Sequence, residues 1–179
     1  MEPSAGGGAT PIAAALVSKI QEQIERTIHL IGLVPVERCG WRPPIAGAWP
    51  VGGVLGHLLD CIAGFCAVLY AAYPERLADF AELRKLPVNQ SCGPAEARER
   101  IAIYRAALDR GFAQLTDAGL ATKLPTVFVA GGEAVLTLLL GNLEHLVNHK
   151  HQLFMYLQLM GVSVGTADLY RFRGEDGEV

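Results

Sequence analysis

Charged residues are scarce in this chain: Asp, Glu, Lys and Arg make up 18% of its 179 residues, and the net charge is -3. Lys and Arg are spread thinly and form no basic stripe of the kind that nucleic-acid binding needs. Hydrophobic residues reach 51%, so the interior is large relative to the surface. We therefore expect no nucleic-acid partner, and an apolar surface patch that supports a homodimer.

The sequence also lacks a C-x-x-C pair, and its first eight residues lack the positive flank and apolar run of an export signal. These absences argue against a zinc ribbon and against a disulfide framework. We expect reduced thiols in a cytoplasmic protein. The cysteines in question are Cys39, Cys61, Cys66 and Cys92.

The apolar stretch from Ala134 to Val147 is interrupted by Asn142, Glu144 and His145. It falls short of the ~20 apolar residues that a membrane span requires, so we expect a buried helix and no membrane partner. The sequence shows no internal repeat and no heptad run long enough for a coiled coil. Its length fits one domain over residues 10–170, with a disordered lead at 1–9 and a tail at 171–179.

Apolar residues spaced three and four apart predict four amphipathic or buried helices. Pro50 suits a first helical turn and Gly161 suits a helix stop. The fold class is therefore all-α. The predicted helices run from about Thr10 to Leu33, from Trp49 to Tyr73, from Pro94 to about Gly119, and from about Glu133 to Met160.

Two connecting segments carry weaker signals. The stretch from Pro74 to Gly93 has room for one short helix around Arg76 to Leu86. The run from Thr126 to Val129 is rich in β-branched and aromatic residues, which predicts a short extended piece before the Gly131-Gly132 turn.

Three histidines are the most informative residues. His145 and His149 are four apart on one predicted helix, so both point from the same face with Cβ atoms roughly 5–6 Å apart. A third imidazole from another helix, His57, would complete a site of three nitrogens. Such a site leaves positions for water or substrate, which distinguishes catalytic from structural metal sites. Ligands that are all nitrogen suit zinc, nickel or iron better than calcium or magnesium.

Several neighbours could support this site. Asp60 and Cys61 lie one turn beyond His57, although Cys61 fits better as a small buried hydrophobe. Gln152 and Tyr156 continue the face of the paired histidines, where they could hydrogen-bond a metal-bound water or simply pack between helices.

A structural interpretation stands beside the metal hypothesis. A lone histidine on an apolar helix is more often a hydrogen-bonded core residue, and H-x-x-x-H occurs by chance on many helices. The alternative is a non-catalytic bundle that binds a small apolar ligand or a protein partner. A structural metal site would be closed by a fourth side chain such as Asp60 or Cys61, whereas an enzyme needs an exchangeable position on the ion.

Two stretches resemble the DinB/YfiT-like family. The first, from Trp41 to Leu58, is similar to the Trp-led approach to the family's second helix, which delivers the first histidine ligand. The second, from His145 to Leu153, is similar to its H-x-x-x-H-R-G-Q-L signature, with Gln152 at the glutamine. Within that stretch Asn148 stands where a further histidine is common, and Lys150-His151 replaces Arg-Gly.

This resemblance implies a four-helix bundle whose long crossover, here residues 74–93, brings helix two beside helix four. It implies metal ligation by His57, His145 and His149. It also implies a metal-dependent hydrolase or a thiol-dependent transferase acting on a small molecule, in the second case with a thiol cofactor. In either reaction a divalent ion lowers the pKa of a bound water or thiol.

Overall fold

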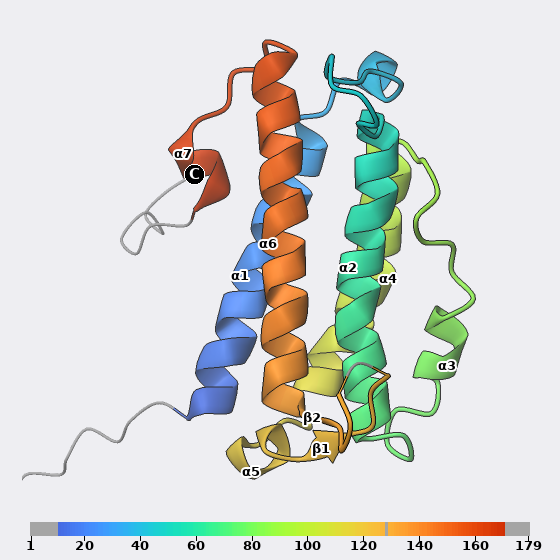
Figure 1. Cartoon of the computed structure of the whole chain (residues 1–179), viewed down its shortest axis with the longest axis vertical. Helices are drawn as coiled ribbons and strands as arrows, with labels where there is room; N and C mark the ends of the chain where they lie inside the picture. Colours follow the sequence, from blue (N-terminus) through green and yellow to red (C-terminus); the bar gives the residue numbers. More distant parts are fainter. Residues whose placement is uncertain (1–10, 128, 171–179) are drawn as a thin grey trace, which may run out of the picture.

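The computed structural model describes residues 11–127 and 129–170. Four long helices lie side by side in it, which confirms the predicted all-α fold (Figure 1). The lead at 1–9 and the tail at 171–179 lie outside the described residues. The long helices are α1 (Ile12–Gly32), α2 (Val51–Ala72), α4 (Pro94–Phe112) and α6 (Val135–Leu159).

Shorter elements connect these helices. Two two-residue strands pair antiparallel, with Lys123 opposite Ala134. The short elements are the 3-10 helix η1 (Val36–Arg38), the helices α3 (Phe80–Leu83), α5 (Asp117–Leu120) and α7 (Thr166–Leu169), and the strands β1 (Lys123–Leu124) and β2 (Glu133–Ala134).

Helix α2 is the centre of the bundle, because it packs against both α4 and α6. The crossover from α2 to α4 runs the length of the molecule and contains α3 (Figure 1). This long connection allows α2 to lie beside α6, as the resemblance implied. The fully buried side chains of α2 that fill the core include Leu55, Leu58, Leu59, Ile62, Phe65 and Leu69.

By length and composition α2 is also the one described helix that could cross a membrane. More than half of its apolar stretch, 56%, is buried inside the bundle. Its apolar character is therefore accounted for by its central position among α4 and α6.

The third predicted helix extends too far. Helix α4 ends at Phe112, seven residues before the expected end at Gly119. The missed signal is Thr116, whose hydroxyl accepts a hydrogen bond from the backbone N–H of Gly119 at 3.0 Å and caps the separate helix α5. The carboxylate of Asp117 in turn accepts a hydrogen bond from the backbone N–H of Ala13, so this turn also caps the start of α1.

The extended piece is misplaced in the sequence prediction. The paired residues are 123–124 and 133–134, which flank the predicted segment from Thr126 to Val129 on both sides; Phe128 lies outside the described residues. Pro125 follows β1 directly and has no N–H to donate, so the pairing stops there. The short crossover helix is present, but it spans only Phe80–Leu83.

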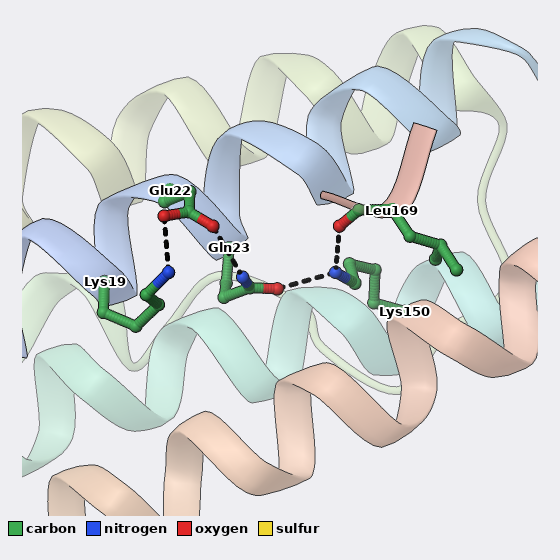
Figure 2. A network of polar contacts seen from close by, with 5 residues as sticks. All are labelled: Lys19, Glu22, Gln23, Lys150 and Leu169. Carbon is green, nitrogen blue, oxygen red and sulfur yellow. Dashed lines mark hydrogen bonds and ion pairs between the residues drawn. The ribbon is translucent and has the colours of Figure 1, made fainter. Parts of the chain in front are cut away.

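A buried lysine holds the C-terminal segment against the bundle (Figure 2). Lys150 of α6 is 2% exposed and donates to Gln23 Oε1 of α1 at 2.6 Å and to the carbonyl oxygen of Leu169 at 2.8 Å. Burial lowers the pKa of Lys150 to about 8. His29 of α1 adds a 2.6 Å contact to Asp168, so α7 is attached to α1 and α6 by side-chain bonds.

Candidate metal centre

The bundle brings together the three histidines that the sequence singled out. His57 comes from α2, and His145 and His149 come from α6. One ring nitrogen from each lies within 4.8 Å of the others. His57 Nε2 and His145 Nε2 are 3.0 Å apart. Helices α2 and α6 are neighbours in the bundle, so the crossover topology produces this convergence.

The rings pack edge to face and do not stack on one another. The centroids of His57 and His149 are 4.2 Å apart with an interplanar angle of 80°. His145 lies 4.9 Å from each of the other two rings, at 69° to His57 and 75° to His149. Three mutually inclined rings can direct lone pairs to one point, whereas stacked rings cannot.

A hydrogen bond from the crossover fixes the orientation of His57. Its Nδ1 lies 2.6 Å from Asn89 Oδ1, an acceptor, so Nδ1 carries the proton and Nε2 keeps its lone pair. Asn89 has a φ of +58°, in the left-handed region that asparagine tolerates. Its backbone N–H donates to the carbonyl oxygen of Gly56 at 3.0 Å, one residue from His57.

Two glycines of α2 make room for this crossover segment. A Cβ on Gly56 would lie 2.0 Å from the carbonyl oxygen of Gln90, and a Cβ on Gly52 would lie 2.5 Å from Ser91 Oγ. The backbone N–H of Cys92 donates to the Gly52 carbonyl oxygen at 3.2 Å. The glycines thus permit the close backbone approach that places Asn89 against His57.

His149 is oriented by two consecutive hydrogen bonds between side chains of its own helix. Its Nδ1 donates to Gln152 Oε1 at 2.8 Å, and Gln152 Nε2 donates to the Tyr156 hydroxyl at 3.3 Å. The Tyr156 ring lies edge-on to Trp41, with centroids 5.6 Å apart. Gln152 and Tyr156 continue the face of the paired histidines, as the spacing predicted, and there Gln152 contacts His149 while Tyr156 contacts Gln152.

The surroundings of His145 favour its neutral form. Burial lowers the pKa of His145 below its usual 6.5, and the neighbouring His149 and His57 lower it further. Asp60 has the opposite, smaller effect on this pKa, so its carboxylate acts on the site through space. Among the described residues Asp60 has no hydrogen bond to a histidine of the cluster. Neutral imidazole is the form that binds a metal ion.

Cys61 and Glu144 take no part in the cluster. Cys61 is fully buried, and desolvation raises the pKa of its thiol to about 12, so it remains a protonated apolar side chain. Glu144 is exposed. Within residues 11–127 and 129–170, no fourth His, Cys, Asp or Glu joins the three histidines.

The donor set fits a divalent transition metal. A zinc–nitrogen bond is about 2.0–2.1 Å, so two nitrogens bound at tetrahedral or octahedral angles lie roughly 2.9–3.4 Å apart. The 3.0 Å separation of His57 Nε2 and His145 Nε2 falls in that range. Two of the three rings already have Nδ1 bound to an amide oxygen, and metal-bound histidines commonly have their second ring nitrogen bound in this way.

Comparison with known proteins gives the family. The sequence model of the DinB superfamily matches residues 19–153, which include all three histidines. The chain belongs to the DinB superfamily. No curated protein matches its sequence.

Solved structures share the fold of this DinB chain. The DinB-like protein YjoA from Bacillus subtilis has a TM-score of 0.66 at 17% identity, over 88% of this chain and 99% of that one. A mycothiol-dependent maleylpyruvate isomerase has a TM-score of 0.53 at 14% identity. That match covers 88% of this chain and 64% of the isomerase, and a histidine-to-alanine variant of the isomerase matches equally well.

Sequence reasoning missed two residues of this DinB site. Asn89 lies in a connecting segment, and no motif connects it to His57, 32 positions earlier. Trp49 was expected only to begin a helix, but its ring stacks on His149, with centroids 5.9 Å apart and planes at 15°, and lies edge-on to His57 at 4.9 Å. The sequence did contain a signal for Trp49, because it lies two helical turns before the candidate ligand His57.

Proposed function

We propose that His57, His145 and His149 bind one divalent transition metal ion, zinc, nickel or iron. The observation that carries this proposal is the pair of amide oxygens, Asn89 Oδ1 and Gln152 Oε1, that accept the Nδ1 protons of two of the histidines. With those protons placed on Nδ1, the Nε2 lone pairs of both rings are available to an ion.

We propose further that this metal-binding protein is an enzyme that acts on a small molecule. A bound divalent ion would supply Lewis-acid chemistry, lowering the pKa of a coordinated water or thiol. The three-histidine set supports this proposal because it leaves coordination positions for such a group. Asn89 and Gln152 hold two of the rings in place, and Asp60 supplies a negative charge that acts on His145.

Of the two reactions that the family suggests, we favour thiol-dependent transfer or isomerisation over hydrolysis. A mycothiol-dependent isomerase shares this fold. A cavity of about 520 Å³ lies beside His57 and has no charged side chain among its described lining residues, so it has room for the body of a small thiol. A cytoplasmic location and a homodimer are part of the same proposal, and both agree with the four free cysteines and the high apolar content.

The second candidate is a non-catalytic bundle with structural histidines. The 3.0 Å contact between His57 Nε2 and His145 Nε2 favours it, since a proton on His145 Nε2 would make this contact a hydrogen bond without any ion. A structural metal site, by contrast, would need a fourth ligand, and neither Asp60 nor Cys61 joins the group.

Elemental analysis separates these candidates. The native protein, purified without a metal-affinity tag, is compared with a variant carrying His145→Ala and His149→Ala, and with a control carrying His151→Ala, an exposed histidine of the same helix. We expect about one metal per chain in the native protein and the control, and none in the double variant. A native protein that holds no metal and takes up neither added zinc nor added nickel would favour the non-catalytic bundle.

A further inference from the structure

The outward face of α6 carries large apolar side chains that the described part of the chain leaves exposed. Helix α6 packs on α2 and α1, and on its remaining face exposed residues recur at intervals of three and four. They include Thr137, Leu140, Glu144, Asn148, His151, Met155 and Leu159. Leu140, Met155 and Leu159 are 47%, 41% and 57% exposed. Apolar side chains gathered on one exposed face are typical of a surface that binds another protein.

The residues of this face are arranged symmetrically about the centre of α6. Three pairs share one midpoint, which lies between Val147 and Asn148, at the middle of the helix. Two of the pairs are apolar, and the third joins an acid to a histidine. The pairs are Leu136 with Leu159, Leu140 with Met155, and Glu144 with His151. The face is therefore complementary to a copy of itself that runs in the opposite direction.

A two-fold axis through this midpoint places two copies of α6 antiparallel and forms every pair twice. In such a contact one residue faces a second, and the second faces the first in turn. Leu140 then packs against Met155 of the other copy, and the carboxylate of Glu144 accepts a hydrogen bond from the ring of its His151. The two helices overlap along their whole length, roughly 37 Å.

We propose that two copies of this chain associate through the outward faces of α6, antiparallel, about an axis beside Val147 and Asn148. This inference rests on the homodimer of the proposed function and adds its surface, orientation and register. A second copy is favoured over a different protein because self-association alone requires pairs that are symmetric about one point. A lipid surface is disfavoured, since Glu144, Asn148 and His151 would lie against it without partners.

This association leaves the histidine cluster uncovered. His145 and His149 leave α6 on the side that packs against α2, where they meet His57. The outward face lies on another side of the same helix, so no ligand of the proposed metal site contacts the second copy. Metal content and association can therefore be measured separately on the same protein.

A change of charge tests the pairing of Glu144 with His151. In His151→Glu two carboxylates face each other twice in the dimer, so we expect the dissociation constant, measured by analytical ultracentrifugation of the full chain, to rise at least about tenfold. Adding Glu144→Lys to this variant restores opposite charges and should recover association. His151→Gln keeps a donor for Glu144 and should remain dimeric. Ala102→Glu, the control, adds the same charge at an exposed position of α4.

Cysteine cross-linking tests the register. The two copies of residue 148 lie beside the axis, so Asn148→Cys should form a disulfide-linked dimer when oxidised with copper phenanthroline. The two copies of residue 137 lie roughly 30 Å apart along the helices, so Thr137→Cys should not. The native chain, treated in the same way, accounts for its own four cysteines.

Circular dichroism confirms that each variant remains helical. A dimer that His151→Glu leaves intact, a double variant that does not recover association, or equal cross-linking at positions 148 and 137 would overturn this interface and leave the homodimer in place. A native chain that stays monomeric at about 100 μM would overturn the homodimer and this inference with it. The metal content of the same samples tests the three-histidine site independently.

Discussion

His57 Nδ1 donates a hydrogen bond to Asn89 Oδ1 over 2.6 Å, and this bond connects the second helix to the crossover that follows it. The crossover therefore does more than join α2 to α4. It contributes the acceptor that selects one tautomer of His57 and directs Nε2 toward His145, 3.0 Å away.

Removing the Asn89 side chain should weaken metal binding. Asn89→Gly deletes the acceptor but keeps a residue that adopts the φ of +58° without strain. We expect metal affinity to fall about 10- to 100-fold, as it does when other hydrogen-bond partners of metal-bound histidines are removed. Competition with a chromophoric zinc chelator measures the change.

Two variants control this experiment. Asn89→Asp keeps an acceptor oxygen and should retain most of the affinity. Asn148→Ala removes the exposed side chain of an asparagine next to His149 and should leave affinity unchanged. An Asn89→Gly protein that binds zinc as tightly as the native chain would show that His57 is oriented by packing alone.

Helical periodicity predicted that His145, His149, Gln152 and Tyr156 share one face, because residues three and four apart do so wherever the helix lies. It could not bring His57 to them; that expectation came from the family resemblance, which implied that α2 lies beside α6. Neither could predict Asn89, because the contact depends on how a 21-residue connection is routed across α2, from Tyr73 to Gly93. The separate helix α5 was missed for a different reason: its signal is local, a single capping hydroxyl at Thr116, and the apolar periodicity of the preceding helix was extended through it.

Gly56→Ala should disturb the metal site through the backbone. The added Cβ would lie 2.0 Å from the carbonyl oxygen of Gln90, so the crossover must move and carry Asn89 away from His57. We expect a loss of about 1–3 kcal/mol in the free energy of unfolding, measured by urea denaturation, together with weaker zinc binding.

Gly141→Ala is the matched control for this helical glycine. Gly141 lies in the interior of α6, and a Cβ added there would meet open space, so the substitution should stabilise the protein by about 0.5–1 kcal/mol. A Gly56→Ala protein that is as stable as Gly141→Ala and binds zinc normally would contradict the close approach of the crossover to α2 at Gly56.

Lys150→Met should loosen the C-terminal segment. The change leaves Gln23 Oε1 and the Leu169 carbonyl oxygen without their buried donor, at a cost of roughly 1–3 kcal/mol. Hydrogen exchange should become faster in α7, with a smaller effect on α2. Lys85→Met, at an exposed lysine that pairs with the neighbouring exposed Glu82, should change stability by less than about 0.5 kcal/mol. Equal effects of the two substitutions would contradict an anchoring role for Lys150.

The stability of the metal-free protein should depend on pH through His145. Burial and the two neighbouring histidines lower the folded-state pKa of His145 below 6.5. As the pH falls through about 6.5, the unfolded chain therefore binds a proton that the folded chain does not, and folding becomes less favourable. Asp168, whose pKa is lowered from 3.8 chiefly by a backbone hydrogen bond from Gly165, loses its contribution to stability only as the pH falls below that range.

Thermal unfolding in the presence of EDTA at pH 7.5 and pH 5.5 measures this effect. We expect a lower melting temperature at pH 5.5, and a smaller difference between the two pH values in His145→Gln, which cannot bind the proton. His151→Gln removes an exposed histidine of the same helix and should keep the native difference. Should His145→Gln show the full native difference, the pH dependence would arise elsewhere, and His145 would not be the ring that the cluster holds neutral.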